Sequence, residues 1–319
     1  MKNTLFTLAL LVSFSSFGQT AEQYFDSALE KYKKEDLNGA IEDYSKVIEL
    51  KPEFSEAYIY RANTVFELTA DFNKVIKDYN KAIELDSNNG YAFFSRALAY
   101  FRKGDNYLAK LDFNKAIELR PNEGNYFRYR AYTKLSLNEY NEACTDIRKS
   151  IQLGIADKNI YQLIEQSCGQ VDEMDYFYVA GIRISQDDYE SAILDYSKAI
   201  EINPRFARAY SQRGITRGFN KENPNDIIDD ISKGIKLGDI TSFNYENRAV
   251  SYAMLGKFSD ALSDFNKAIE LESENYTTYE LRGKIKFVIG DANGACQDWE
   301  QALKLGSEIA AKLITEQCK

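Results

Sequence analysis

The sequence contains no histidine among its 319 residues. This absence removes the most common general base in enzymes and the most common protein ligand of transition metals. A zinc-protease HExxH motif is therefore excluded, and neither a GxxxxGK phosphate loop nor a GxSxG nucleophile motif occurs. These absences leave carboxylates as the main candidates for any catalytic chemistry.

Basic residues are in the minority. There are 40 Lys and Arg against 49 Asp and Glu, which gives a net charge of −9. A protein that neutralises phosphates needs a basic surface, so nucleic acid is not expected as a partner. Tryptophan occurs once, but there are 23 Tyr and 19 Phe, and 44% of the residues are hydrophobic. This composition is typical of a folded, globular chain.

The only long apolar run lies at the N-terminus. Lys2 gives a positive start, residues 4–14 are mostly apolar, and Ser16 and Gly18 supply small residues. This order predicts a signal peptide over residues 1–18. A membrane anchor is the alternative, but the run is shorter than the roughly 20 residues that span a bilayer. We expect an exported protein, periplasmic or secreted, with no integral membrane segment after cleavage.

The rest of the chain repeats with a period of about 34 residues. Residues 40–52 read AIEDYSKVIELKP, and residues 109–121 and 192–204 are near copies. The first residue of this string, the register residue, recurs at Ala40, Val75, Ala109, Ala143, Ala192, Ile227, Ala261 and Ala295. Apolar residues at the register position, four and seven later, such as Ala261, Phe265 and Ala268, predict a helix. Each repeat reads as a hairpin of a first and a second helix, and such hairpins must stack to bury both apolar faces.

These units resemble tetratricopeptide repeats. An aromatic residue opens the first helix, as at Tyr58 and Phe93, and a small residue follows four later, as at Ala62 and Ala97. Proline closes three repeats, at Pro52, Pro121 and Pro204. The pattern extends over nearly all of the chain after residue 18, in eight repeats. The resemblance implies an all-α solenoid, a superhelix of helix-turn-helix hairpins.

The chain is also duplicated. A shift of 152 residues carries Ala40 onto Ala192, and 15 extra residues separate the fourth repeat from the fifth. Each block ends with one more amphipathic segment, and a terminal repeat needs such a lid. We therefore predict two capped blocks of four repeats, 19–170 and 171–319. One continuous superhelix that absorbs the extra helix is the alternative.

Arginine and aspartate recur at fixed positions. An Arg precedes the small residue of the first helix in six repeats, but Ser27 and Val179 replace it in the first repeat of each block. An Asp follows every register residue by three. We expect each Arg to pair with the Asp of the preceding repeat, which a first repeat lacks. Solvated surface charges, worth little as isolated pairs, are the alternative.

The four cysteines occupy equivalent places in the two blocks. Cys144 and Cys296 follow the last register residue of a block, and Cys168 and Cys318 end the capping segments. Each second helix runs about ten residues from its Cys and the cap runs about ten back, each near 15 Å. We predict the disulfides Cys144–Cys168 and Cys296–Cys318, which suit an oxidising compartment. Free buried thiols are the alternative, and a zinc site is not expected because two Cys per block without His are too few ligands.

The resemblance also implies a function. In such repeats the first helices line a concave groove that binds extended peptides or partner helices. Carried over by position, the partner-binding residues of the first block are Phe25, Tyr32, Ile59, Asn63, Phe66, Phe94, Leu98, Phe101, Arg128 and Tyr132. Aromatic residues dominate binding hot spots, although these rings could instead fill the packing between repeats.

We therefore expect a non-catalytic protein-protein interaction scaffold of the cell envelope or extracellular space. Nearly every distinctive acid recurs at a repeat-equivalent position, which favours a scaffold role, so we expect no enzyme activity, no cofactor and no metal. A self-assembling homo-oligomer is the second hypothesis. A carboxylate-based hydrolase is a remote third, because composition alone leaves a carboxylate pair open.

Overall fold

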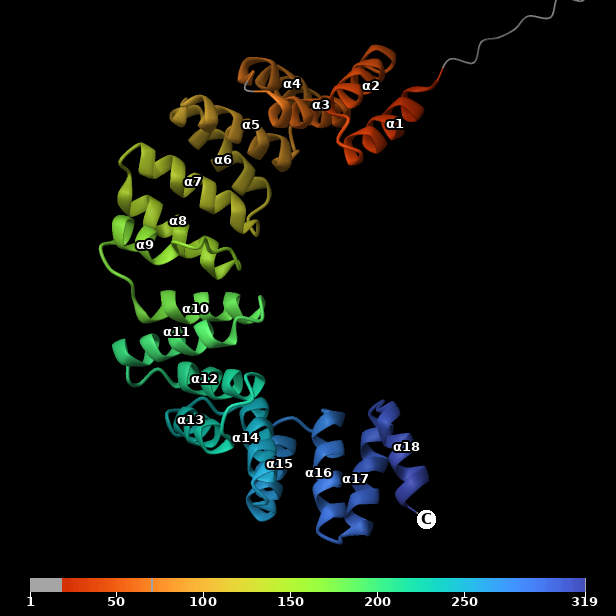
Figure 1. Ribbon diagram of the computed structural model, residues 1–319, viewed down its shortest axis with the longest axis vertical. Helices are drawn as coiled ribbons and strands as arrows, with labels where there is room; N and C mark the ends of the chain where they lie inside the picture. Colours follow the sequence, from red (N-terminus) through yellow and green to blue (C-terminus); the bar gives the residue numbers. More distant parts are fainter. Residues whose placement is uncertain (1–18, 70, 319) are drawn as a thin grey trace, which may run out of the picture. The chain divides into compact units, whose positions relative to one another are not determined.

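The computed structural model describes residues 19–69 and 71–318, so the predicted signal peptide lies outside the described residues (Figure 1). The described ranges contain 18 α-helices and no β-strand, which confirms the all-α class. The chain divides into two compact units, with the division between Glu139 and Tyr140. Unit 1 contains three helical hairpins followed by one further helix, and unit 2 contains four hairpins together with helices outside them.

Unit 1 contains the first seven helices. In chain order they are α1 (Ala21–Lys33), α2 (Leu37–Leu50), α3 (Ser55–Leu68), α4 (Phe72–Leu85), α5 (Gly90–Lys103), α6 (Asn106–Leu119) and α7 (Gly124–Ser136). The helices α1, α3, α5 and α7 are the first helices of the predicted repeats. Within this unit α3 contacts α5 and α5 contacts α7, so the first helices form a layer of their own.

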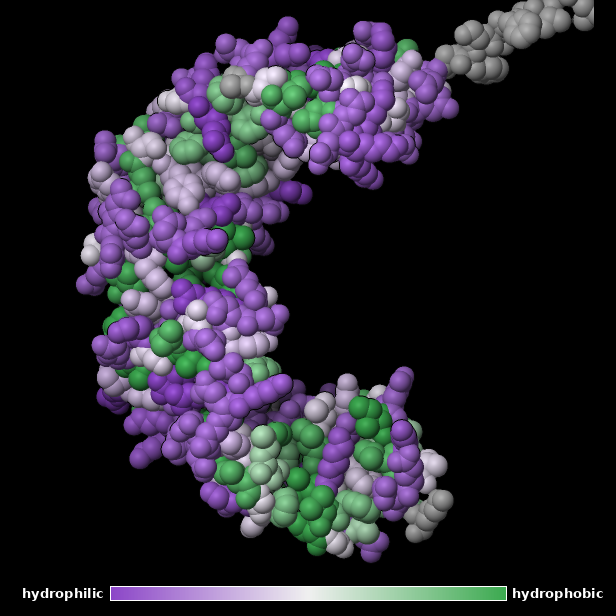
Figure 2. Space-filling view, in the orientation of Figure 1, coloured by the Kyte–Doolittle hydropathy of each residue, from purple (hydrophilic) through white to green (hydrophobic). Residues whose placement is uncertain are grey.

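Unit 2 contains the remaining helices. They are α8 (Tyr140–Gln152), α9 (Ile160–Cys168), α10 (Glu173–Ile184), α11 (Tyr189–Ile202), α12 (Ala207–Phe219), α13 (Pro224–Lys236), α14 (Ser242–Met254), α15 (Phe258–Leu271), α16 (Tyr276–Val288), α17 (Ala292–Lys304) and α18 (Glu308–Gln317). Here the first helices are α10, α12, α14 and α16. Figure 2 shows hydrophobic residues gathered on the surface over α16 and α17.

None of the helices in the described part of the chain is long and apolar enough to cross a membrane.

The core of each hairpin follows the register predicted from the sequence. Ala109 and Phe113 of α6 are fully buried against Ala97 of α5. The small residues let the two helices approach, and the ring four positions after the register residue fills the space between them. Other repeats also bury a large side chain four positions after the register residue, namely Tyr44, Tyr79, Tyr196, Phe265 and Trp299.

The recurring arginines pair with a different aspartate from the one predicted. Arg96 of α5 donates from Nε and Nη2 to Asp112 of α6, at 2.6 and 2.7 Å, so it binds the Asp of its own repeat. Its Nη1 reaches back to Asn80 of the preceding hairpin at 2.8 Å. The prediction of pairing with the preceding repeat's Asp is therefore wrong. The same pairing occurs at Arg61–Asp78, Arg213–Asp230, Arg248–Asp264 and Arg282–Asp298.

The inserted helix α9 contacts both α8, which precedes it, and α10, which follows it. Tyr161 of α9 lies against Tyr176 of α10, with ring centroids 4.6 Å apart. Arg148 of α8 also pairs with Asp172 and Asp175, at 2.7 and 3.0 Å. The helix predicted as a lid therefore contacts the hairpin that follows it. The block boundary at 170/171 stays a prediction, because it rests on the duplicated sequence and not on the division at Tyr140.

Both predicted cysteine pairs lie at bonding distance. The sulfurs of Cys144 and Cys168 are 2.12 Å apart, and those of Cys296 and Cys318 are 2.02 Å apart. Each bond joins a second helix, α8 or α17, to the segment that packs on it. The capping segments are thus held covalently.

Candidate functional site

The ten predicted partner-binding residues lie on the first helices of unit 1. Phe25 and Tyr32 belong to α1, while Ile59, Asn63 and Phe66 belong to α3. The α5 helix carries Phe94, Leu98 and Phe101, and α7 carries Arg128 and Tyr132. The structure gives these residues different surroundings, and four of them meet at one cavity.

This cavity, the α3–α5 cavity, has a volume of about 230 Å³. It is lined by Asn63, Phe66, Glu67, Tyr79, Tyr91, Phe94, Ser95 and Leu98. The lining comes from α3 and α5, with Tyr79 contributed by α4 at the base. All of its parts belong to unit 1.

A hydrogen-bond chain fixes the polar side of the cavity. The buried Tyr79 hydroxyl donates to Oδ1 of Asn63 at 2.5 Å, and Nδ2 of Asn63 donates to the Tyr91 hydroxyl at 3.2 Å. Burial raises the pKa of Tyr79, so this phenol stays neutral. Asn63 thus positions one buried and one exposed tyrosine and joins α4, α3 and α5.

The apolar side of the cavity is held by aromatic packing. Phe94 stacks on Tyr126 of α7 with centroids 4.3 Å apart and contacts Phe113 at 5.8 Å. The ring centroids of Phe66 and Phe72 are 5.9 Å apart. Rings packed from behind have little freedom to reorient, so the cavity wall is preformed.

One carboxylate lies at the rim. Glu67 is exposed at the end of α3, and its Oε2 accepts a hydrogen bond from the Tyr32 hydroxyl of α1 at 2.7 Å. This hydrogen bond raises the pKa of Tyr32, because the carboxylate favours the protonated phenol. Glu67 also borders a neighbouring hollow lined by Tyr32, Lys33, Glu35 and Leu37.

None of the other six predicted residues lines the cavity, although Tyr32 reaches its rim through the hydrogen bond to Glu67. Phe101 packs against the cluster of Ala97, Ala109 and Phe113. Ile59 is buried, and Phe25 packs within 5.4 Å of the Phe54 and Tyr60 rings, between the first two hairpins. Arg128 lies over the Tyr129 ring at 5.0 Å, and Tyr132 contacts the same ring at 6.1 Å. Phe25 and Ile59 therefore serve the packing of the stack.

Four of the lining residues were not predicted from the sequence: Glu67, Tyr79, Tyr91 and Ser95. A signal for Glu67 was present, because equivalent positions carry Lys33, Arg102 and Ser136. A residue that departs from its repeat equivalents is not needed by the scaffold. Tyr79 gave no such signal, since its position is the buried aromatic of the repeat.

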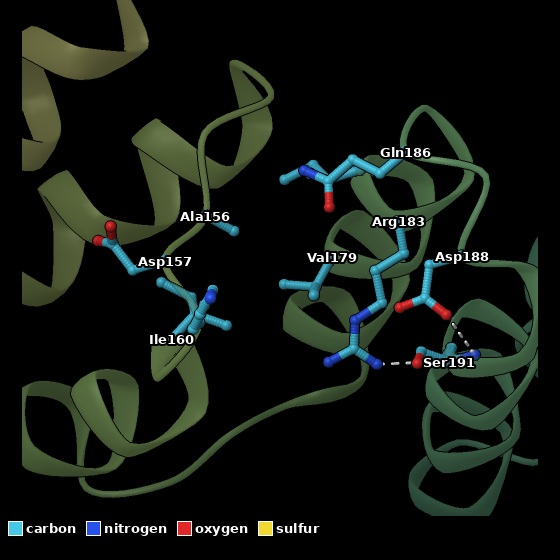
Figure 3. Close-up of a pocket in the computed structure, with 10 residues that line it drawn as sticks. Ala156, Asp157, Ile160, Val179, Arg183, Gln186, Asp188 and Ser191 are labelled. Atoms are coloured by element: carbon cyan, nitrogen blue, oxygen red, sulfur yellow. Dashed lines mark hydrogen bonds between the residues drawn. The ribbon is translucent and has the colours of Figure 1, made fainter.

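A second cavity lies in unit 2, at the inserted helix. It has a volume of about 490 Å³ and is lined by Ala156, Asp157, Lys158, Ile160, Val179, Ile182, Arg183, Gln186, Asp188 and Ser191 (Figure 3). Its walls come from the segment before α9 and from α10 and the start of α11. This cavity was not predicted from the sequence, because the inserted segment has no equivalent within the repeats.

Polar groups of the second cavity already serve the fold. Arg183 Nη1 donates to the Ser191 carbonyl at 3.1 Å (Figure 3). The same nitrogen pairs with the buried Asp195 at 2.9 Å. Asp188 accepts the Ser191 N–H and caps α11. Burial raises the pKa of Asp195 to about 6. We therefore take the α3–α5 cavity as the stronger candidate for binding.

Comparison with known families agrees with the hairpin architecture. A tetratricopeptide repeat model matches residues 21–54 and 91–123, and a TPR repeat model matches residues 182–217. The chain carries tetratricopeptide repeats. The 18 helices fit roughly eight TPR units. Proteins with such repeats generally mediate protein-protein interactions and are generally non-catalytic scaffolds.

Several solved structures resemble the TPR chain. A chain of the APC/C hetero-tetramer Cut9–Hcn1 has a TM-score of 0.46 and 12% identity, covering 89% of this chain and 53% of that one. A tetratricopeptide repeat protein from Parabacteroides merdae has a TM-score of 0.42 and 18% identity, covering 95% and 100%. The first TPR of Spaghetti (RPAP3), bound to the HSP90 peptide SRMEEVD, has a TM-score of 0.37 and 24% identity, covering 38% and 94%. No curated protein matches the sequence.

Proposed function

We propose that this TPR protein is a non-catalytic scaffold that binds an extended segment of a partner protein along the first helices of unit 1. The observation that carries the proposal is the α3–α5 cavity, where four groove residues predicted from the sequence come together. Its rings are held by Tyr126 and Phe72 from behind, so binding would cost little ordering of the site. Clustered aromatic side chains of this kind are typical of binding hot spots.

Affinity capture with ring-deleted variants tests the proposal. Phe66→Ala and Phe101→Ala should each reduce capture of the partner, because both remove a ring from the first-helix face. Tyr107→Ala is the matched control, since Tyr107 is a 64% exposed aromatic on the second helix α6. Equal capture by all three variants and the wild type would reject the groove assignment.

The proposed location is the cell envelope or the extracellular space. The support is the signal-like segment at residues 1–18 and the two cysteine pairs, since disulfides persist in oxidising compartments. Cell fractionation should find the chain outside the cytoplasm with all four cysteines paired. A chain without residues 2–18 should stay in the cytoplasm, and an unchanged distribution would contradict export.

Self-association is a second candidate function, and one observation favours it. Phe219, Met254 and Val288 occupy equivalent positions at the ends of α12, α14 and α16 and are 53, 67 and 63% exposed. Because these helices are neighbours, the three residues form an apolar row, and such rows often mark interfaces. A second copy of the chain would bury it. Light scattering should then show concentration-dependent mass that Met254→Asp abolishes, whereas a concentration-independent monomer would remove this candidate.

A further inference from the structure

We infer that the α3–α5 cavity binds a basic side chain of the partner segment, arginine in preference to lysine. The inference rests on the proposed function and gives its site a ligand class. Four kinds of observation carry it: the charge of the lining, the aromatic walls, the hydrogen-bonding groups at the rim, and the departure of these residues from the repeat pattern.

The charge of the lining is negative. Glu67 is the only acidic residue among the eight described residues that line the cavity, and no lysine or arginine is among them. The neighbouring hollow adds Lys33 and Glu35, one charge of each sign, so the two hollows together stay negative. An acidic side chain would meet the Glu67 carboxylate and be repelled, whereas a basic one would pair with it.

The walls are aromatic. Phe66, Phe94, Tyr79 and Tyr91 contribute rings to a cavity of about 230 Å³, a size suited to one long side chain. Ring faces attract cations, and the attraction is stronger where water is excluded. The aliphatic part of a basic side chain would lie along Leu98 and the rings, with its charged end at the rim.

The polar groups at the rim favour a guanidinium. Glu67 Oε2 accepts one hydrogen bond from Tyr32, and a carboxylate offers about four acceptor sites on its two oxygens. A planar guanidinium donates to a carboxylate through two parallel N–H groups and stacks on aromatic faces. An ammonium group pairs with the carboxylate as a point charge and lacks the planar stacking surface, which gives arginine the advantage.

These residues are peculiar to this place in the stack. The positions equivalent to Asn63 in the flanking first helices are Leu29 and Leu98, and those equivalent to Glu67 are Lys33 and Arg102. The scaffold is thus built elsewhere without the amide and without the carboxylate. In the first repeat, where Leu29 replaces Asn63, the equivalent buried Tyr44 hydroxyl has no hydrogen-bond partner in the described residues. The amide and acid at the second repeat therefore equip this cavity in a way that packing does not require.

Nuclear magnetic resonance with single-side-chain probes tests the inference. The mature chain, labelled at its aromatic carbons, is titrated with N-acetyl-arginine N-methylamide, and with the lysine, norleucine and glutamate analogues. The arginine probe should shift the Tyr91 and Phe94 ring signals saturably and bind at least about tenfold more tightly than norleucine. Lysine should lie between them, and glutamate should give no shift.

A variant that removes the charge of Glu67 at nearly constant size, together with a control variant, tests whether this charge contributes to binding. Glu67→Gln keeps the size and still accepts from Tyr32, and it should weaken arginine binding about tenfold. Glu56→Gln, an exposed acid on the same helix outside the cavity, should leave binding unchanged. An arginine probe that causes no shift, or that binds equally to wild type and Glu67→Gln, overturns the inference.

The outcomes also separate this inference from the proposed function. Norleucine or glutamate shifting the same rings as strongly as arginine would leave a binding cavity and reject the basic ligand. Partner capture that survives both Phe66→Ala and Phe101→Ala would reject the groove itself, whichever probe binds.

Discussion

Among single residues, Asp195 makes stability depend most directly on pH. Its side chain is 5% exposed in α11, and burial raises its pKa to about 6 although Arg183 lies 2.9 Å away. An aspartate in an unfolded chain titrates near 3.9, so the folded state binds this proton more tightly. The contribution of Asp195 to stability therefore rises as the pH falls from about 6 to about 4, and it is lost as the pH rises through 6.

Asp195→Asn should remove this dependence. The amide does not titrate, so the variant's unfolding free energy relative to the wild type should increase between pH 4.5 and pH 7.5, by on the order of 2 kcal/mol. Urea denaturation of both proteins at pH 4.5, 5.5 and 7.5 measures the difference. A difference that is the same at all three pH values would contradict the raised pKa.

The arginine pairs show what sequence alone could and could not predict at this scale. That Arg and Asp pair was predictable from their recurrence, but the partner was not. Arg61 is 18 residues after Asp43 of the preceding repeat and 17 before Asp78 of its own. Since a first helix packs between two second helices, sequence spacing favours neither, and only the direction of the side chain decides.

At the scale of helices, how closely the two helices of a hairpin approach depends on the sizes of the side chains that face each other between them. Trp299 of α17 is buried against Gly283 of α16, and a Cβ at Gly283 would lie 2.5 Å from Trp299 Nε1. Other hairpins pair alanine with a smaller ring, such as Ala249 with Phe265. The glycine thus accommodates the single tryptophan of the chain.

Gly283→Ala should therefore destabilise the protein although alanine favours helix. Overpacking of this kind costs roughly 1–3 kcal/mol. Gly181→Ala is the matched control, because a Cβ built there in α10 meets open space beyond its own helix backbone. The control should gain roughly 0.5–1 kcal/mol from helix propensity. Thermal or urea unfolding compares the two, and a stabilised Gly283→Ala would show that α16 and α17 do not pack this closely.

The capping segments depend on covalent bonds. Cys168 ends α9 and joins it to α8, and Cys318 follows α18 and joins it to α17. The sequence supported this pairing because a second helix and a cap of similar length run in opposite directions. It did not reveal the packing of Tyr161 on Tyr176, since the insertion has no equivalent within the repeats.

The double variant Cys144→Ser, Cys168→Ser should lose about 3 kcal/mol of unfolding free energy in the chain-entropy model. Denaturation with and without reductant measures the loss. Reductant should destabilise the wild type more than the double variant, which retains one bond. A wild type insensitive to reductant would contradict the disulfides.

For the whole molecule, the repeats allowed the architecture to be predicted from the sequence. They allowed only some of the residues that line the candidate site to be predicted. Eight register residues in phase predicted stacked hairpins, and the two units contain seven such hairpins among the described residues. The groove positions were carried over by repeat register, which treats all first helices alike. Phe25 and Ile59 are consequently packing residues, while Glu67 and Tyr91, which differ from their equivalents, line the cavity. We therefore expect the binding residues of this stack at positions that depart from the repeat pattern.

If recognition takes place at the α3–α5 cavity of unit 1, a photoreactive side chain placed there should react with the partner protein. Photo-crosslinking in the cells that make the protein tests it most directly, with p-benzoylphenylalanine at Tyr91, at Tyr107 and at Met254, which are 42, 64 and 67% exposed. We expect an adduct with a different protein from position 91 alone, and we expect Glu67→Lys to suppress it. No adduct from Tyr91, together with a self-adduct from Met254, would contradict it.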